Sequence, residues 1–146
     1  MTIDKYKDKG LSGLANLGNT CFLNACLQVL SHTDEFNEFL DLKIYKNKLN
    51  KKVDSLLLVE WDNLRTLLWK ENCVISPAMF VKTVQEIAKH KGLELFTGFN
   101  QNDVSEFLIF VIANFTPPMK TLFAIKFLSK LSFEKTSVPG LYISPS

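Results

Sequence analysis

The sequence predicts a mainly α-helical protein built around one compact core. Apolar residues recur at three- and four-residue spacing in several long segments, which is the period of a buried helix face. The 146 residues include only six glycines and five prolines, the residues that most often interrupt helices. Hydrophobic residues make up 47% of the chain, enough apolar material for one core. We therefore expect one helical unit, followed by an irregular C-terminal tail.

A polar leader and two helices are expected in the N-terminal part of the chain. The leader, residues 1–10, is rich in charged side chains. Apolar residues cover most of the next segment, 22–30, which predicts a buried helix. A short second helix is expected at 34–40. Residues that commonly cap helices precede both segments: Asn19 or Thr20 the first, and Thr33 or Asp34 the second.

A basic loop and the longest helix follow. Lysines scattered between residues 43 and 52 predict a solvated loop. Residues 53–69 carry apolar side chains at three- and four-residue spacing, which predicts a long amphipathic helix. Trp61 and Trp69 lie in this pattern, and we expect both in the core.

Two more helices are expected before the tail. Ser76 as N-cap and Pro77 as first helical residue favour a helix over 78–88, which should end near Gly92. Residues 100–115 begin with capping and acidic side chains and then become strongly apolar, which predicts a core helix that Pro117 and Pro118 cannot continue. The segment 119–131 fits another amphipathic helix, and 132–144 shows only a weak strand pattern.

Composition excludes several classes of protein. The net charge is only +2, so nothing indicates nucleic-acid binding. The N-terminus lacks the apolar stretch of a signal peptide, and no apolar run is long enough to cross a membrane. Three cysteines at irregular spacing form neither a disulfide framework nor a zinc motif, and we expect no metal or cofactor. These features predict an intracellular protein, cytoplasmic or nuclear.

Cys21 is the strongest candidate for a chemical role. It lies in the run GLANLGNTCFLNACLQ, residues 13–28, between a turn containing Asn and Gly and the start of a helix. A thiol on the first turn of a helix feels the positive end of the helix dipole, which favours the thiolate. The structural alternative is a buried thiol, which is the commoner role of cysteine. That alternative is expected for Cys26 and Cys73.

Two sequence blocks resemble the ubiquitin-specific proteases, the papain-like family that removes ubiquitin from proteins. Residues 13–30 resemble the family's cysteine box. QNDVSEFL, residues 101–108, resembles its Gln-Gln-Asp box, which lies in the helical thumb subdomain. The resemblance implies a thumb-like part of the catalytic domain over 11–116, with the leader 1–10 before it and an unmatched tail at 117–146.

The resemblance also implies roles for individual residues. Cys21 matches the nucleophile, and Asn16 matches the side chain that donates to the oxyanion of the tetrahedral intermediate. Gln101, Asp103 and Glu106 match residues that bind the extended ubiquitin tail. Structural alternatives stay open: Asn16 is also a typical turn residue, and the two acids also suit a helix N-terminus. The sequence departs from the family pattern at Asn102, where a second Gln is usual, and at Ser105.

No candidate general base accompanies these residues. The chain has only His32 and His90, and both are expected at helix C-termini rather than in the family's histidine box. We therefore expect a truncated cysteine-type deubiquitinase that is weak or inactive as an isolated chain. The alternatives are a non-catalytic ubiquitin-binding module and a degraded remnant. A further possibility is a complementing chain that supplies the palm subdomain and the histidine box.

Overall fold

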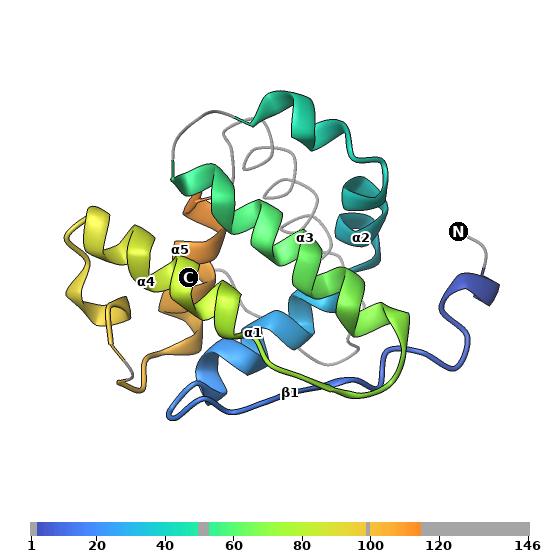
Figure 1. Ribbon diagram of the computed structural model, residues 1–146, viewed down its shortest axis with the longest axis horizontal. Helices are drawn as coiled ribbons and strands as arrows, with labels where there is room; N and C mark the ends of the chain where they lie inside the picture. Colours follow the sequence, from blue (N-terminus) through green and yellow to red (C-terminus); the bar gives the residue numbers. More distant parts are fainter. Residues whose placement is uncertain (1–2, 50–52, 99, 115–146) are drawn as a thin grey trace, which may run out of the picture.

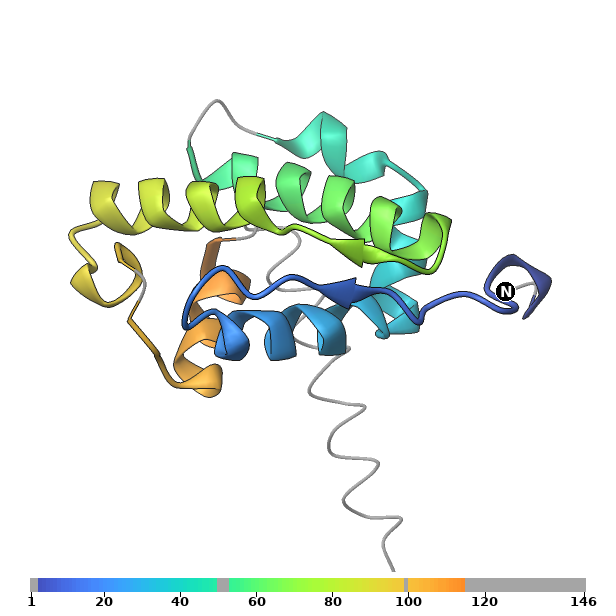
Figure 2. The same ribbon diagram turned by 60° about the horizontal axis from the view of Figure 1, so that its bottom comes forward.

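The computed structural model describes residues 3–49, 53–98 and 100–114. Within them the chain is mainly helical, which confirms the predicted fold class (Figure 1). Two layers of helices are visible in Figure 2, with α3 and α4 above and α1 and α5 below. The bounds are α1 Cys21–Ser31, α2 Asp34–Asp41, α3 Asp54–Lys70, α4 Ala78–His90 and α5 Val104–Asn114, with short 3-10 turns η1 Ile3–Lys5, η2 Ile44–Lys48 and η3 Glu94–Phe96.

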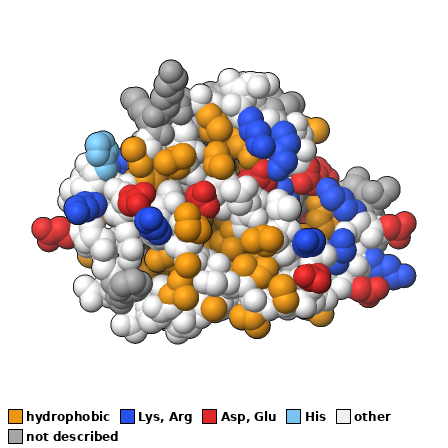
Figure 3. Space-filling model, in the orientation of Figure 1, with side chains coloured by type: hydrophobic (Ala, Val, Ile, Leu, Met, Phe, Trp, Pro, Cys, Tyr) orange, Lys and Arg blue, Asp and Glu red, His pale blue; other side chains and the backbone are white. Residues whose placement is uncertain are grey.

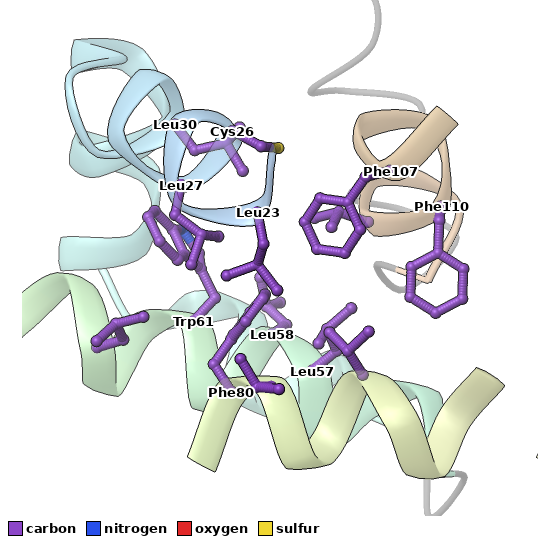
Figure 4. Packing of buried hydrophobic residues seen from close by; sticks show 14 of the residues in the cluster. Leu23, Cys26, Leu27, Leu30, Leu57, Leu58, Trp61, Phe80, Phe107 and Phe110 are labelled. Atoms are coloured by element: carbon purple, nitrogen blue, oxygen red, sulfur yellow. The ribbon is translucent and has the colours of Figure 1, made fainter. Parts of the chain in front are cut away.

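The core lies between the two layers. Trp61 of α3 is fully buried, and its ring meets Phe80 of α4 edge to face with 6.2 Å between the ring centroids. Leu23 and Leu27 of α1 point toward this pair from the opposite layer (Figure 4). The three- and four-residue spacing of apolar side chains thus gives each helix one face for a shared core, as predicted. Trp69 is only partly buried at the edge of that core.

Some predicted helix boundaries are displaced by a few residues. Residues 100–103 stay outside α5, which begins at Val104. Pro77, rather than Ser76, is the residue that precedes α4. Gly92 follows α4 with a φ of +69°, so the predicted end of that helix is confirmed. The expected helix at 119–131 and the strand pattern at 132–144 lie outside the described residues.

A short parallel strand pair was not predicted. β1 (Gly13–Leu14) pairs with β2 (Val74–Ile75), in the register Gly13 to Val74 and Leu14 to Ile75. The backbone of Cys73 takes part, because its carbonyl accepts from the Gly13 N–H at 3.0 Å. Its side chain is exposed, so the expectation that Cys73 packs in the core is wrong. Pairing uses its backbone and leaves the thiol in solvent.

In the described part of the basic loop, Lys43 and Lys46 are exposed, as predicted, but Tyr45 between them is buried. Lys43 forms an ion pair with Asp62 of α3, and the buried Tyr45 donates its hydroxyl to the same carboxylate. Arg65, which is 4% exposed, bridges Asp62 at 2.8 Å and Asp41 of α2 at 2.9 Å. These ion pairs join η2, α2 and α3. The loop is therefore attached to the helices by ion pairs, although its sequence predicts a solvent-exposed loop.

The pKa values in this cluster follow from its hydrogen bonds. Burial alone would raise the pKa of Asp62, but bonds from Lys43, Tyr45 and Arg65 outweigh burial and lower that pKa. Burial, and then the bond to Asp62, raise the pKa of Tyr45. A carboxyl group whose pKa is lower in the folded chain stabilises the fold above the ordinary carboxyl pKa. That stabilisation is lost as the pH falls through the lowered value.

The leader packs against the helices. Lys5 forms an ion pair with Asp41, and the ring of Tyr6 meets Trp69 edge to face at 4.8 Å. Asn72 donates to the carbonyl of Asp8 at 2.8 Å. A Cβ at Gly10 would lie 2.8 Å from the Trp69 ring, so only glycine fits there without displacement. These contacts place residues 3–10 on the surface of α2 and α3.

The face seen in Figure 3 shows apolar side chains between charged groups. Leu67 of α3 is 49% exposed and Met79 of α4 is 61% exposed. In the part of the chain that the structure describes, no helix combines the length and apolarity that crossing a membrane requires.

Replacing Asp62 with Asn should destabilise the protein by about 2 to 3 kcal/mol at pH 7, because Lys43 and Arg65 would lose their shared carboxylate. The loss should shrink below about pH 4, where carboxyl groups ordinarily become protonated. Urea unfolding followed by circular dichroism at both pH values measures this. The control is Glu38→Gln, which removes an exposed charge of α2. An equal loss for Asp62→Asn at both pH values would contradict this electrostatic account.

Candidate active site

The turn before α1 is held together by the side chain of Asn16. Its Oδ1 accepts hydrogen bonds from the N–H of Gly18 at 3.0 Å, the N–H of Thr20 at 3.2 Å and the Thr20 hydroxyl at 3.0 Å. Gly18 and Asn19 take the left-handed φ values, +90° and +50°, that this tight turn requires. The Asn-Gly-rich sequence therefore forms a closed turn directly ahead of Cys21.

Thr20 precedes α1, as predicted, but its side chain does not cap the helix. Its hydroxyl instead accepts from the Leu17 N–H at 3.0 Å and donates to Asn16. Its carbonyl accepts from the Asn24 N–H at 2.9 Å, which closes the first helical turn. One buried threonine thus joins the turn to the helix that carries the thiol.

The turn fixes the orientation of the Asn16 amide. Because Oδ1 receives three donors from the turn, the Nδ2 group must point away from it. Asn16 is exposed, and Nδ2 has no acceptor among the described residues. The predicted turn role of Asn16 is therefore observed. That role leaves two N–H donors free for a ligand, so a second role as an oxyanion donor is compatible with it.

Cys21 is exposed on the first turn of α1, at the positive end of the helix dipole. Cys26, on the same helix, is buried, and burial raises the pKa of its thiol to about 12. The predicted packing role of Cys26 is confirmed. Two thiols of one helix therefore differ in chemistry, and only Cys21 is accessible to a substrate.

Gln101 reaches Cys21 from the other end of the described chain. Its Nε2 lies 3.5 Å from the Cys21 sulfur and donates a hydrogen bond to it. Packing of α1 against α5 brings the two residues together. Phe22, the residue after Cys21, meets Phe107 edge to face at 5.3 Å. The sequence motifs suggested one common site but did not predict this contact.

The two acids lie at the start of α5. Asp103 precedes the helix, and its Oδ1 accepts from the Glu106 N–H at 3.0 Å. This is the capping role expected as a structural alternative. Both acids are exposed, so their remaining oxygens can meet a ligand.

Asn102 is fixed by the loop before α5. Its Nδ2 donates to the carbonyls of Leu95 and Asn100, each at 2.9 Å. The departure from the family pattern at this position thus has a structural use. A small hollow lies beside the loop, between α1, α4 and α5; its lining includes Phe22, Phe96 and Phe107.

Neither histidine contacts Cys21 in the described parts of the chain. His32 follows α1, where Nδ1 lies 2.9 Å from the Gln28 carbonyl and Nε2 lies 3.2 Å from the Gly10 carbonyl. His90 ends α4 and is exposed. Both therefore lie at helix C-termini, as predicted. Among the described residues, no group of three or more His, Cys, Asp or Glu side chains could hold a metal ion.

Comparison with known proteins supports the two motifs. The family model "Ubiquitin carboxyl-terminal hydrolase" matches residues 12–138. The chain is 36% identical over 115 residues to "Ubiquitin carboxyl-terminal hydrolase 2" of Bos taurus, covering 76% of this chain and 18% of that relative. For the Homo sapiens protein of the same name, identity is 37% over 108 residues, covering 71% and 17%. The chain therefore spans less than a fifth of the length of these relatives.

Two substitutions at Asn16 should show whether the stability of the turn depends on its acceptor atom, Oδ1, or on its Nδ2 donors. Asn16→Asp keeps the oxygen that the turn requires, so stability should change by less than about 0.5 kcal/mol. Asn16→Ala removes three accepted bonds and should cost about 1 to 2 kcal/mol. Thermal and urea unfolding measure both values. Equal destabilisation by the two variants would show that the turn does not depend on Oδ1.

Proposed function

Because the chain belongs to the ubiquitin carboxyl-terminal hydrolase family, we propose that it carries the nucleophile side of a cysteine-type deubiquitinase. One observation carries most of the proposal. The exposed Cys21 thiol lies at a helix N-terminus and accepts a hydrogen bond from Gln101, a residue of the second family motif. The match of the family model over both motifs supports the same reaction class.

In the proposed reaction, the Cys21 thiolate attacks the carbonyl carbon at the C-terminus of ubiquitin. The bond to the leaving amine breaks after that nitrogen receives a proton, and a thioester remains on Cys21. Water then attacks the thioester, which releases the ubiquitin carboxylate and returns the thiol. The Nδ2 donors of Asn16 would bind the oxyanion formed in both steps. An oxyanion donor of this kind typically lowers the activation free energy by about 3 kcal/mol.

The start of α5 provides charge for binding the substrate. Asp103 and Glu106 are exposed carboxylates close in sequence to Gln101. We propose that they bind the arginine-containing tail of ubiquitin, since charge-assisted bonds between carboxylate and guanidinium are strong and directional. Capping by Asp103 uses only one of its oxygens, so binding and capping are compatible.

We propose that the general base comes from outside these 146 residues. His32 is engaged with backbone carbonyls of the leader and α1, and His90 ends α4. The base and the orienting group would come from further sequence of a longer chain or from a complementing polypeptide. The free thiols of Cys21, Cys26 and Cys73 support a reducing, intracellular setting for this assembly.

Ubiquitin carrying an electrophile in place of its C-terminal glycine should form a covalent adduct with this chain at Cys21. The same reagent should not modify Cys73, which is also exposed but lies outside the site. Intact-protein and peptide mass spectrometry identify the modified residue, and Cys21→Ala is the control. Modification of both cysteines at equal rates would contradict the proposed recognition.

A fluorogenic ubiquitin C-terminal amide should show no multiple turnover with the isolated chain, because the base is missing. Cys21-dependent multiple turnover would overturn the proposal that the base comes from elsewhere. Titration of labelled ubiquitin followed by NMR provides the second measurement. Shifts at the ubiquitin tail without any adduct would favour a binding module over an enzyme.

A further inference from the structure

We propose that Gln101 is a positioning residue for the nucleophile: its amide donates to the Cys21 sulfur and holds it in place before the substrate arrives. The inference rests on the proposed role of Cys21 as the nucleophile. It gives Gln101 a different first role from the substrate-tail contact that the family resemblance implies. The observation that supports this role is the 3.5 Å contact between Nε2 of Gln101 and the Cys21 sulfur.

The backbone around Gln101 is fixed on its C-terminal side. Asn102 donates to the carbonyls of Leu95 and Asn100 at 2.9 Å. Asp103 accepts from the Glu106 N–H at 3.0 Å and thereby caps α5. Gln101 precedes these two anchored residues, so its side chain starts from a defined position although it is exposed. The contact with the sulfur therefore costs less ordering than a contact made from a loose loop.

The backbone on both sides of Cys21 is also fixed. The Asn16 turn and the buried Thr20 hold the residue before Cys21. On the other side, Phe22 packs against Phe107 of α5 at 5.3 Å. The aromatic pair sets the spacing of α1 and α5. The sulfur and the amide are thus positioned by neighbours that are buried or hydrogen-bonded themselves.

The chemistry of the amide suits a thiolate. A carboxamide N–H donates without carrying a charge, and a hydrogen bond to an ionised acceptor is stronger than one to a neutral acceptor. The Oε1 atom of the same amide would repel a thiolate, so an ionised sulfur selects the observed Nε2 contact. Among the described residues, neither Asp103 nor Glu106 contacts the sulfur with its carboxylate. Gln101 is the neutral donor that the second motif provides at the nucleophile.

The rate at which iodoacetamide alkylates Cys21 at pH 7 tests this role in the full 146-residue chain. Peptide mass spectrometry follows each cysteine separately, and the exposed Cys73 serves as internal reference. Gln101→Met keeps the length of the side chain but removes the donor. The ratio of the Cys21 rate to the Cys73 rate should fall about two- to fourfold, because the attacking sulfur loses the donor that orients it and hydrogen-bonds to its negative charge. Gln101→Glu should lower the ratio further, since it also adds a negative charge.

A matched control is available in Gln85→Met. The Nε2 atom of Gln85 also makes a 3.5 Å bond, in this case to the carbonyl of Gly98, so the same substitution removes an equivalent contact away from the sulfur. Its ratio should equal that of the wild type. An unchanged or higher ratio in Gln101→Met would overturn the proposal, because a side chain that only shields the thiol would give that result.

This test is independent of ubiquitin. Iodoacetamide needs neither the substrate tail nor a general base, so the ratio reports only the environment of the sulfur. Failure of the ubiquitin electrophile to label Cys21 would contradict the proposed function. A lower alkylation ratio in Gln101→Met would still establish the contact, so the two failures can be distinguished.

Discussion

The edge-to-face contact between Phe22 and Phe107 is the interaction on which the site depends. It lies between α1 and α5, and both rings are buried. Aromatic pairs of this kind contribute about 0.5 to 1.5 kcal/mol beyond the area that they bury. The contact closes a loop of some eighty residues and places the cysteine motif beside the Gln101 motif. Without this packing, the two motifs would be separate exposed segments with no common chemistry.

The site is built from exposed groups that are positioned by buried or hydrogen-bonded neighbours. Cys21 lies between the buried residues Thr20 and Phe22, while Gln101 is followed by the hydrogen-bonded Asn102. Asn16 is exposed, yet its oxygen is fixed by three donors. This arrangement separates two requirements. Neighbouring residues supply rigidity, so the reactive groups themselves can remain in contact with solvent and substrate.

The helices and the family could be predicted from the sequence, because helical periodicity and two dense motifs are local signals. The contact of Gln101 with Cys21 could not, since it depends on how α1 and α5 pack. The exposed lysines of the basic loop could be predicted, but the ion pair of Lys43 with the buried Asp62 of α3 could not, because no local pattern reveals it. The exposure of Cys73 could not be predicted for a related reason: the neighbouring strands have only two residues each, which is too short for a detectable periodicity.

The two cysteines of α1 show why position within the helix decides chemistry here. They are five residues apart, which turns their side chains by about 140° around the helix axis. Cys26 therefore faces the core, where burial keeps the thiol protonated, whereas Cys21 faces solvent beside a neutral donor. The side-chain donor to the sulfur comes from the segment before α5. The side of Cys21 that faces solvent is thus the side from which a reaction partner can approach the sulfur.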